Sequence, residues 1–117
     1  MKRLLLFCCL CIGPAVIAQQ FLPRYELVKL GPQVNTFYHE AAPIISPDGK
    51  ELYFFVSNHP ENTHGKDNTQ DIWMTRKNDK GEWSKAEHPG GALNQHQVNQ
   101  VFTILRDGSL LIRGGRG

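Results

Sequence analysis

The sequence predicts an all-β protein: one four-stranded antiparallel β-propeller blade plus the start of a second blade, with the propeller incomplete. Two similar stretches recur at a constant offset, since Asn35 matches Asn94 and Asp48 matches Asp107, each 59 positions apart. Short segments rich in aromatic and β-branched residues alternate with Gly and Pro turns. No window past the N-terminal region places apolar residues at helical spacing without an intervening Gly, Pro or Asn.

Residues 1–18 have the pattern of a secretory signal peptide. A basic start at Lys2 and Arg3 precedes an apolar run from Leu4 to Val16, and small residues favour cleavage after Ala18. The alternative, a membrane anchor, needs roughly 20 apolar residues and this run is shorter. We therefore expect a periplasmic or secreted protein with no membrane span after cleavage. Association of the exported protein with the outer membrane is an alternative that the sequence leaves open.

Removal of the signal peptide changes the charge and cysteine counts. The chain has 13 Lys plus Arg and 11 Asp plus Glu, so losing Lys2 and Arg3 leaves 11 of each sign. A balanced surface does not favour nucleic acid as a partner. The three cysteines, Cys8, Cys9 and Cys11, leave with the same segment, so no disulfide or thiol chemistry is expected in the exported part.

The first part of the exported chain is assigned in order. Residues 19–30 form a lead-in segment, with an edge strand as the alternative at 25–28. Residues 31–89 form the first blade, which opens with a short strand at 43–46. A Ser-Pro-Asp-Gly-Lys turn follows, in which Asp48 accepts backbone hydrogen bonds and Gly49 takes a left-handed conformation. The second strand is expected at 51–57.

The rest of the first blade alternates loops and strands. Residues 58–70 form a polar loop that is long for a compact domain, which makes it functional or mobile. Strands are expected at 71–76 and 83–87, joined by a turn that closes with Gly81. Residues 90–117 repeat the opening pattern and form a truncated second blade.

The motif order resembles the TolB-type WD-like β-propeller repeat. The resemblance rests on Ser46-Pro47-Asp48-Gly49-Lys50, on Asp71-Ile72-Trp73, on Gly81-x-Trp83-Ser84 and on the restart at Gly90 to Asn94. It spans about residues 31–113. The family resemblance implies a propeller fold and a binding or scaffolding role in the bacterial cell envelope.

One blade and part of another are too few to close a propeller, which needs about four. The second copy also has Leu105-Arg106 where the first has Ser46-Pro47. We expect a truncated reading frame, with assembly with other chains as the alternative. A lone blade is expected to leave an apolar face exposed, with one Trp and with Leu52, Phe54, Val56, Ile72 and Met74, and therefore to be poorly soluble or molten.

The polar loop supplies the candidate binding residues, which share ligand-capable side chains: His59, Glu61, Asn62, His64, Asp67 and Asp71. The spacing of His59 and His64 fits neither a zinc motif nor a calcium loop, so no metal and no cofactor are expected. A solvated loop is the competing interpretation. Asp48 is assigned to its turn, and Trp73 and Trp83 to packing between blades in preference to sugar stacking.

No Gly-x-Ser-x-Gly elbow is present, and no catalytic residue is assigned. Two functions stay open. The first is a non-enzymatic exported propeller module that binds a protein or glycan partner in the envelope. The second is the N-terminal propeller remnant of an exported serine peptidase or other hydrolase whose catalytic domain is missing.

Overall fold

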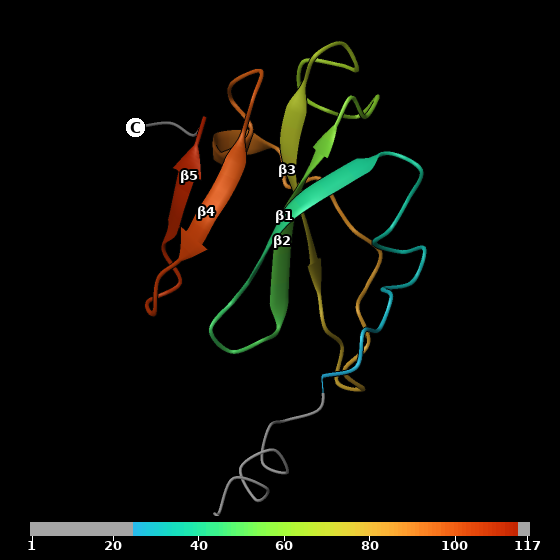
Figure 1. The fold of residues 1–117 in the computed structure, drawn as a ribbon. Coiled ribbons are helices and arrows are strands. Elements are labelled where there is room, and N and C mark those ends of the chain that lie inside the picture. Colours follow the sequence, from blue (N-terminus) through green and yellow to red (C-terminus); the bar gives the residue numbers. More distant parts are fainter. Residues whose placement is uncertain (1–24, 115–117) are drawn as a thin grey trace, which may run out of the picture.

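The computed structural model describes residues 25–114 and consists of β-strands, turns and loops. Its five strands form a three-stranded sheet, β1-β2-β3, and a two-stranded sheet, β4-β5 (Figure 1). The one helical element within this range is a single 3₁₀ turn, η3, at Gly91–Leu93. The predicted all-β class with almost no helix is therefore confirmed. The expected signal peptide at residues 1–18 lies outside the described residues.

The first sheet is an antiparallel meander. β1 spans His39–Ile45, β2 spans Glu51–Ser57 and β3 spans Gln70–Arg76. β2 has the predicted bounds, while β1 begins before the predicted position 43. The extra pairs join Glu40 to Val56 and Ala41 to Phe55, ahead of a bulge that ends at Ile44. Ala42 has a φ of 50° in this bulge. A positive φ is uncommon for alanine, so the sequence does not predict that the strand continues through this position.

The turn between β1 and β2 confirms the prediction made from Asp48 and Gly49. The Gly49 amide donates to the Ser46 carbonyl at 2.8 Å, and Gly49 has a φ of 72°. Asp48 Oδ1 accepts from the Lys50 amide at 3.0 Å and from the Ser46 hydroxyl at 2.6 Å. These hydrogen bonds, the one from Ser46 first, lower the pKa of Asp48 below 3.8. The turn is thus fixed by side chains as well as by glycine.

The fourth strand predicted at 83–87 is wrong. That segment forms two isolated bridges, one from Glu87 to Met74 in β3 and one from Trp83 to Lys77, the residue after β3. Between them the Ala86 amide turns away from β3 and donates to the Gln33 carbonyl at 2.8 Å. The segment divides its hydrogen bonds between β3 and the chain before β1, so it forms no continuous ladder.

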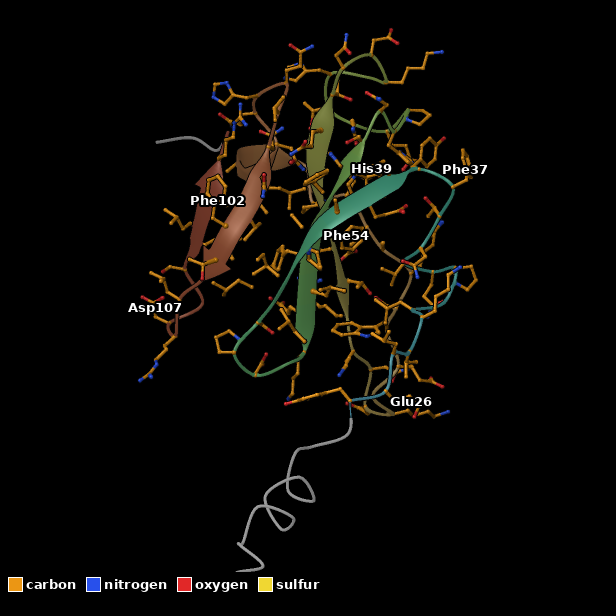
Figure 2. All side chains as sticks on the ribbon, viewed as in Figure 1. Glu26, Phe37, His39, Phe54, Phe102 and Asp107 are labelled. Carbon is orange, nitrogen blue, oxygen red and sulfur yellow. The ribbon has the colours of Figure 1, made fainter. Side chains whose placement is uncertain are left out.

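The second sheet is a hairpin of β4, Gln100–Ile104, and β5, Leu110–Arg113. Asp107 lies at the tip of its turn (Figure 2), where the Gly108 amide donates to the Leu105 carbonyl at 3.0 Å. This bond lies 59 positions after the one from Gly49 to Ser46. The two turns differ in the hydrogen bond that closes them. In the second turn the Leu105 amide donates to the Ser109 carbonyl, whereas in the first turn the Ser46 amide donates to the Glu51 carbonyl. The second turn is one residue shorter.

The shorter turn decides which face of β5 is inside. Leu110 and Ile112 pack toward the first sheet, whereas Leu111 is 57% exposed and Arg113 is exposed. Side chains alternate between the faces of a strand, so a shift of one residue exchanges the two sets. By the repeat offset, Leu111 would have occupied the buried position of Leu52.

Two apolar clusters cover the two faces of the first sheet. On one face, Leu52, Phe54, Val56 and Trp73 are buried under residues that precede β1 and follow β3: Leu30, Val34, Tyr38, Trp83 and Ala86. On the other face, Tyr53, Ile72 and Met74 are buried under Val101 and its neighbours from the second sheet. The expected exposed apolar face is therefore wrong. Both faces are covered by the chain itself, because residues 30–38 and 83–86 pack on one face and the second hairpin packs on the other.

The lead-in segment has no strand between residues 25 and 30. Tyr25, Leu27 and Val28 are 90%, 102% and 75% exposed. The edge-strand alternative at 25–28 is not found. The chain begins to pack only at Leu30 and Val34, where the amides of Val34 and Asn35 both donate to the Gly31 carbonyl at 3.0 Å.

Candidate functional site

The loop at residues 58–69 lies at one end of the sheets, opposite the turns at 46–50 and 105–109 (Figure 1). Asn62 holds it to the sheet and is 4% exposed. Its Nδ2 donates to the Val56 carbonyl and to Thr69 Oγ1, both at 3.0 Å, and its Oδ1 accepts from the Trp73 indole nitrogen at 3.1 Å. Both amide hydrogens and the amide oxygen are bonded inside the protein, so Asn62 anchors the loop and is not a free ligand.

Asp71 is a second buried anchor. The residue is 0% exposed. Its Oδ2 accepts from the Thr63 amide at 2.6 Å and lies 2.8 Å from His88 Nε2, while its Oδ1 accepts from Asn99 Nδ2 at 2.8 Å. The carboxylate therefore ties the loop at 58–69 to the loop at 88–99. A buried carboxylate with three partners stabilises this end of the fold and offers no open position to a ligand.

Asn94 completes the connection between the loops. It is 1% exposed, and its Oδ1 accepts from the Ile72 amide at 2.7 Å while its Nδ2 donates to the Ile72 carbonyl at 2.9 Å. Ile72 itself is 0% exposed. Asn94 thus acts as one residue of an extra strand along the edge of β3. Its counterpart in the first repeat, Asn35, makes one such bond, from Nδ2 to the Leu30 carbonyl.

His59 belongs to a row of rings. Its centroid lies 4.3 Å from Tyr38 and 4.4 Å from Trp73, and Trp73 lies 5.3 Å from His88, each pair meeting edge to face. The Nδ1 atom of His59 accepts from the Glu61 amide at 3.1 Å. The first turn of the loop therefore rests on Trp73, and this contact holds Glu61 near the sheet.

A pocket of about 150 Å³ opens beside this row. Its buried lining residues are apolar, namely Val34, Phe54, Val56 and Trp73, which we call its floor. Its charged lining residues are the less buried Glu40, Glu61 and Lys85, which we call its rim. The complete lining is Pro32, Gln33, Val34, Thr36, Glu40, Phe54, Val56, His59, Glu61, Trp73, Lys85 and Ala86. We call it the Trp73 pocket. It contains two of the six predicted candidates, His59 and Glu61.

The remaining two candidates lie elsewhere on the loop end. His64 is exposed and its Nε2 lies 3.2 Å from the Gln95 carbonyl, in an open depression shared with His96 and Gln97. Asp67 is exposed. The six predicted residues are thus divided among a pocket, two buried anchors and the outer surface of the loop.

A larger groove of about 510 Å³ separates the two hairpin turns. Arg76 lies in it and is paired with Glu51 at 3.0 Å and Glu87 at 2.7 Å. The Glu51 hydrogen bond raises the pKa of Arg76. Asp107 also lines the groove, and the hydrogen bond from the Ser109 amide lowers its pKa. Since the acids and Arg76 are already engaged in turns and ion pairs, this groove is a weaker candidate than the Trp73 pocket.

Within residues 25–114, no group of three or more His, Cys, Asp or Glu side chains is arranged to hold a metal ion. None of the helical segments in that range has the length and apolar character needed to cross a bilayer.

Sequence reasoning missed Glu40, His88, Asn94 and Asn99 as site residues. The repeat is the one sequence signal for two of them, because Asn94 lies 59 positions after Asn35 and Asn99 lies 59 positions after Glu40. The repeat indicates a structural role for both residues but does not predict which strand they bind.

Comparison of the chain with protein-family models, with curated proteins and with solved structures found no match.

Proposed function

We propose that this chain is a non-enzymatic exported binding module whose two sheets are a propeller blade and the beginning of a second, of the TolB-type WD-like kind. It contacts a protein or glycan partner in the bacterial cell envelope through the loop end formed by residues 58–69 and 88–99. The recurrence of the Asp-Gly turn bond after 59 positions supports the repeat. The packing of the two sheets face to face supports their assignment to successive blades.

One observation carries the binding role. The two loops are fixed from within by Asn62, Asp71 and Asn94, which are all buried, while polar side chains on the outside are exposed. His64, Lys66 and His96 are among these exposed residues. A surface that is already ordered loses little conformational entropy when a partner binds. Rigid support under variable polar loops is the usual arrangement in binding modules.

The test is site-specific photo-crosslinking of the full chain in the envelope of a Gram-negative host, together with co-sedimentation on purified peptidoglycan. The photoreactive residue is placed at Lys66 or His96 on the loop end, and at Lys80 on the turn at 77–82 as the matched control. We expect a discrete crosslinked product or sedimentation with peptidoglycan that depends on the loop-end positions. Equal crosslinking from Lys80, or neither product nor sedimentation, contradicts the proposal.

A further inference from the structure

The Trp73 pocket is sized for a side chain. Its volume of about 150 Å³ is below the roughly 300–1,000 Å³ of pockets that enclose drug-sized ligands. It is also not a sugar platform, because Trp73 is 7% exposed and presents too little ring for a pyranose to stack on. A narrow, apolar-floored pocket of this kind accepts the end of one extended chain of atoms.

The charge around the pocket favours a cation. Glu40 Oε1 accepts from the amide and the hydroxyl of Thr36, which leaves Oε2 of the same carboxylate without a partner among the described residues. Glu61 also lines the pocket and is exposed, on the loop at 58–69. Within residues 25–114 neither carboxylate is in an ion pair. Two carboxylates against the single ammonium of Lys85 give the rim a net negative charge.

The aromatic wall adds to this preference. His59 and Trp73 both line the pocket, and their rings meet at 4.4 Å. Because Trp73 is only 7% exposed, its attraction for an alkylammonium or guanidinium group is a small addition to the charge of the rim. Val34 and Val56 on the floor suit the methylene stem that joins such a group to a peptide backbone.

We propose that the Trp73 pocket binds a basic side chain, lysine or arginine, presented by a partner protein. The inference rests on the proposed binding function, whose partner class it narrows from protein or glycan to a protein with an exposed basic residue. The cation enters between Glu40 and Glu61, and its stem lies on Val34 and Val56. Lys85 competes for the same carboxylates and weakens binding.

The test uses the full chain with Trp83→Phe, which leaves Trp73 as the single tryptophan and hence the fluorescent reporter. The probes are the N-acetyl methylamides of arginine and lysine, with those of citrulline and norleucine as matched uncharged probes and N-acetylglucosamine as the sugar. We expect saturable binding of the charged pair, with at least about tenfold weaker binding of the uncharged pair and of the sugar. Citrulline or N-acetylglucosamine binding as tightly as arginine overturns the inference.

Variants of the rim give a second readout. Glu61→Gln is expected to weaken arginine binding about two- to fivefold, the size of one partly exposed ion pair, and Lys85→Gln to strengthen it by a similar factor. Glu82→Gln, at an exposed carboxylate bonded to Asn78 in the turn at 77–82, is the control and should change nothing. Equal effects of Glu61→Gln and Glu82→Gln contradict the inference. A variant that fails to fold is recognised by its far-ultraviolet circular dichroism. In that case the salt concentration is raised with the unmutated rim, and this must weaken binding of the arginine and lysine probes but not of the citrulline and norleucine probes.

The outcomes separate the two proposals. If the charged probes bind in the pocket while crosslinking at Lys66 and His96 yields nothing, the inference stands and the proposed envelope function fails. If crosslinking succeeds and the charged probes do not bind, the binding function stands and the inference is wrong.

Discussion

Replacing Asn94 with alanine tests the connection between the second repeat and the first sheet. The substitution removes the acceptor of the Ile72 amide and the donor to the Ile72 carbonyl, bonds of 2.7 and 2.9 Å. Ile72 is 0% exposed, so water does not readily replace either partner. A buried backbone group left unpaired costs about 1–3 kcal/mol. Asn94→Ala leaves two such groups, the Ile72 amide and the Ile72 carbonyl. We therefore expect it to lower the free energy of unfolding by about 2–6 kcal/mol, twice the cost of one group.

The matched control is Asn35→Ala, the same change 59 positions earlier. Asn35 makes one side-chain bond, to the carbonyl of the half-buried Leu30, which water can replace. Its loss is expected to cost about 0.5–1.5 kcal/mol, the net value of an ordinary hydrogen bond. The two variants therefore differ although the residue type and the repeat position are the same.

The assay is urea unfolding of the full chain, followed by tryptophan fluorescence and far-ultraviolet circular dichroism. For a domain near this size each kcal/mol also lowers Tm by about 4–8 °C, so thermal unfolding gives an independent estimate. Equal urea midpoints for Asn94→Ala and Asn35→Ala would refute the reasoning. That result would mean that Asn94 does not act as a strand residue along β3.

Three further predictions concern the turn, the core and a tyrosine. Ser46→Ala removes the largest cause of the lowered pKa of Asp48, so that pKa should move up toward 3.8 in a carboxyl NMR titration. Because the pKa of Asp48 is lower in the folded protein, its stabilising effect exists above the unfolded value and is lost as the pH falls through the folded one. Ile72→Ala in the fully buried centre of the sheet should cost about 2–5 kcal/mol in urea unfolding. Burial, and next the Glu51 hydrogen bond, raise the pKa of Tyr53 to about 12, so stability present below pH 10 should fall between pH 10 and 12, as followed by phenolate absorbance and circular dichroism.

Each of these has a control in the same chain. Asp107 has Leu105 at the place of Ser46, and its pKa is lowered first by the Ser109 amide, so Ser46→Ala should leave it unchanged. Phe102, 51% exposed on the outer face of β4 (Figure 2), should tolerate alanine far better than Ile72 does. For Tyr53 the control is Tyr53→Phe, which lacks the phenol and should show no loss of stability between pH 10 and 12. A common response of each residue and its control would contradict the corresponding prediction.

The sequence predicts a strand best where the turn beside it is formed by residues of the turn itself. β2 lies between the Asp48-Gly49 turn and a polar loop, and its bounds are as expected. β1 was predicted too short, because its extension depends on a positive φ at Ala42 that tertiary pairing imposes. The strand predicted at 83–87 is wrong because the Ala86 amide binds the Gln33 carbonyl and not β3. Gln33 lies about 50 positions away in the sequence, so no local pattern predicts this bond.

The candidate site was predicted in part for a similar reason. Loop composition identified His59 and Glu61, which line the Trp73 pocket. The same composition could not distinguish Asn62 and Asp71, whose side chains are consumed by buried partners. The partners of Asp71, among them His88 and Asn99, come from a different loop. Burial of a polar residue is decided by such distant contacts and leaves no local pattern.

The one-residue difference between the two hairpin turns limits how copies of this chain can associate. The first sheet offers Tyr53, Ile72 and Met74 to the second, whereas the second sheet offers outward Phe102, Leu111 and Arg113. Another copy adding to that outward face would have to bury an unpaired guanidinium, which is strongly unfavourable. Head-to-tail growth needs the same pair of complementary surfaces at every step. Both faces of the first sheet are already covered within this chain, so the outward face of the second sheet has no free face of the first sheet to stack on.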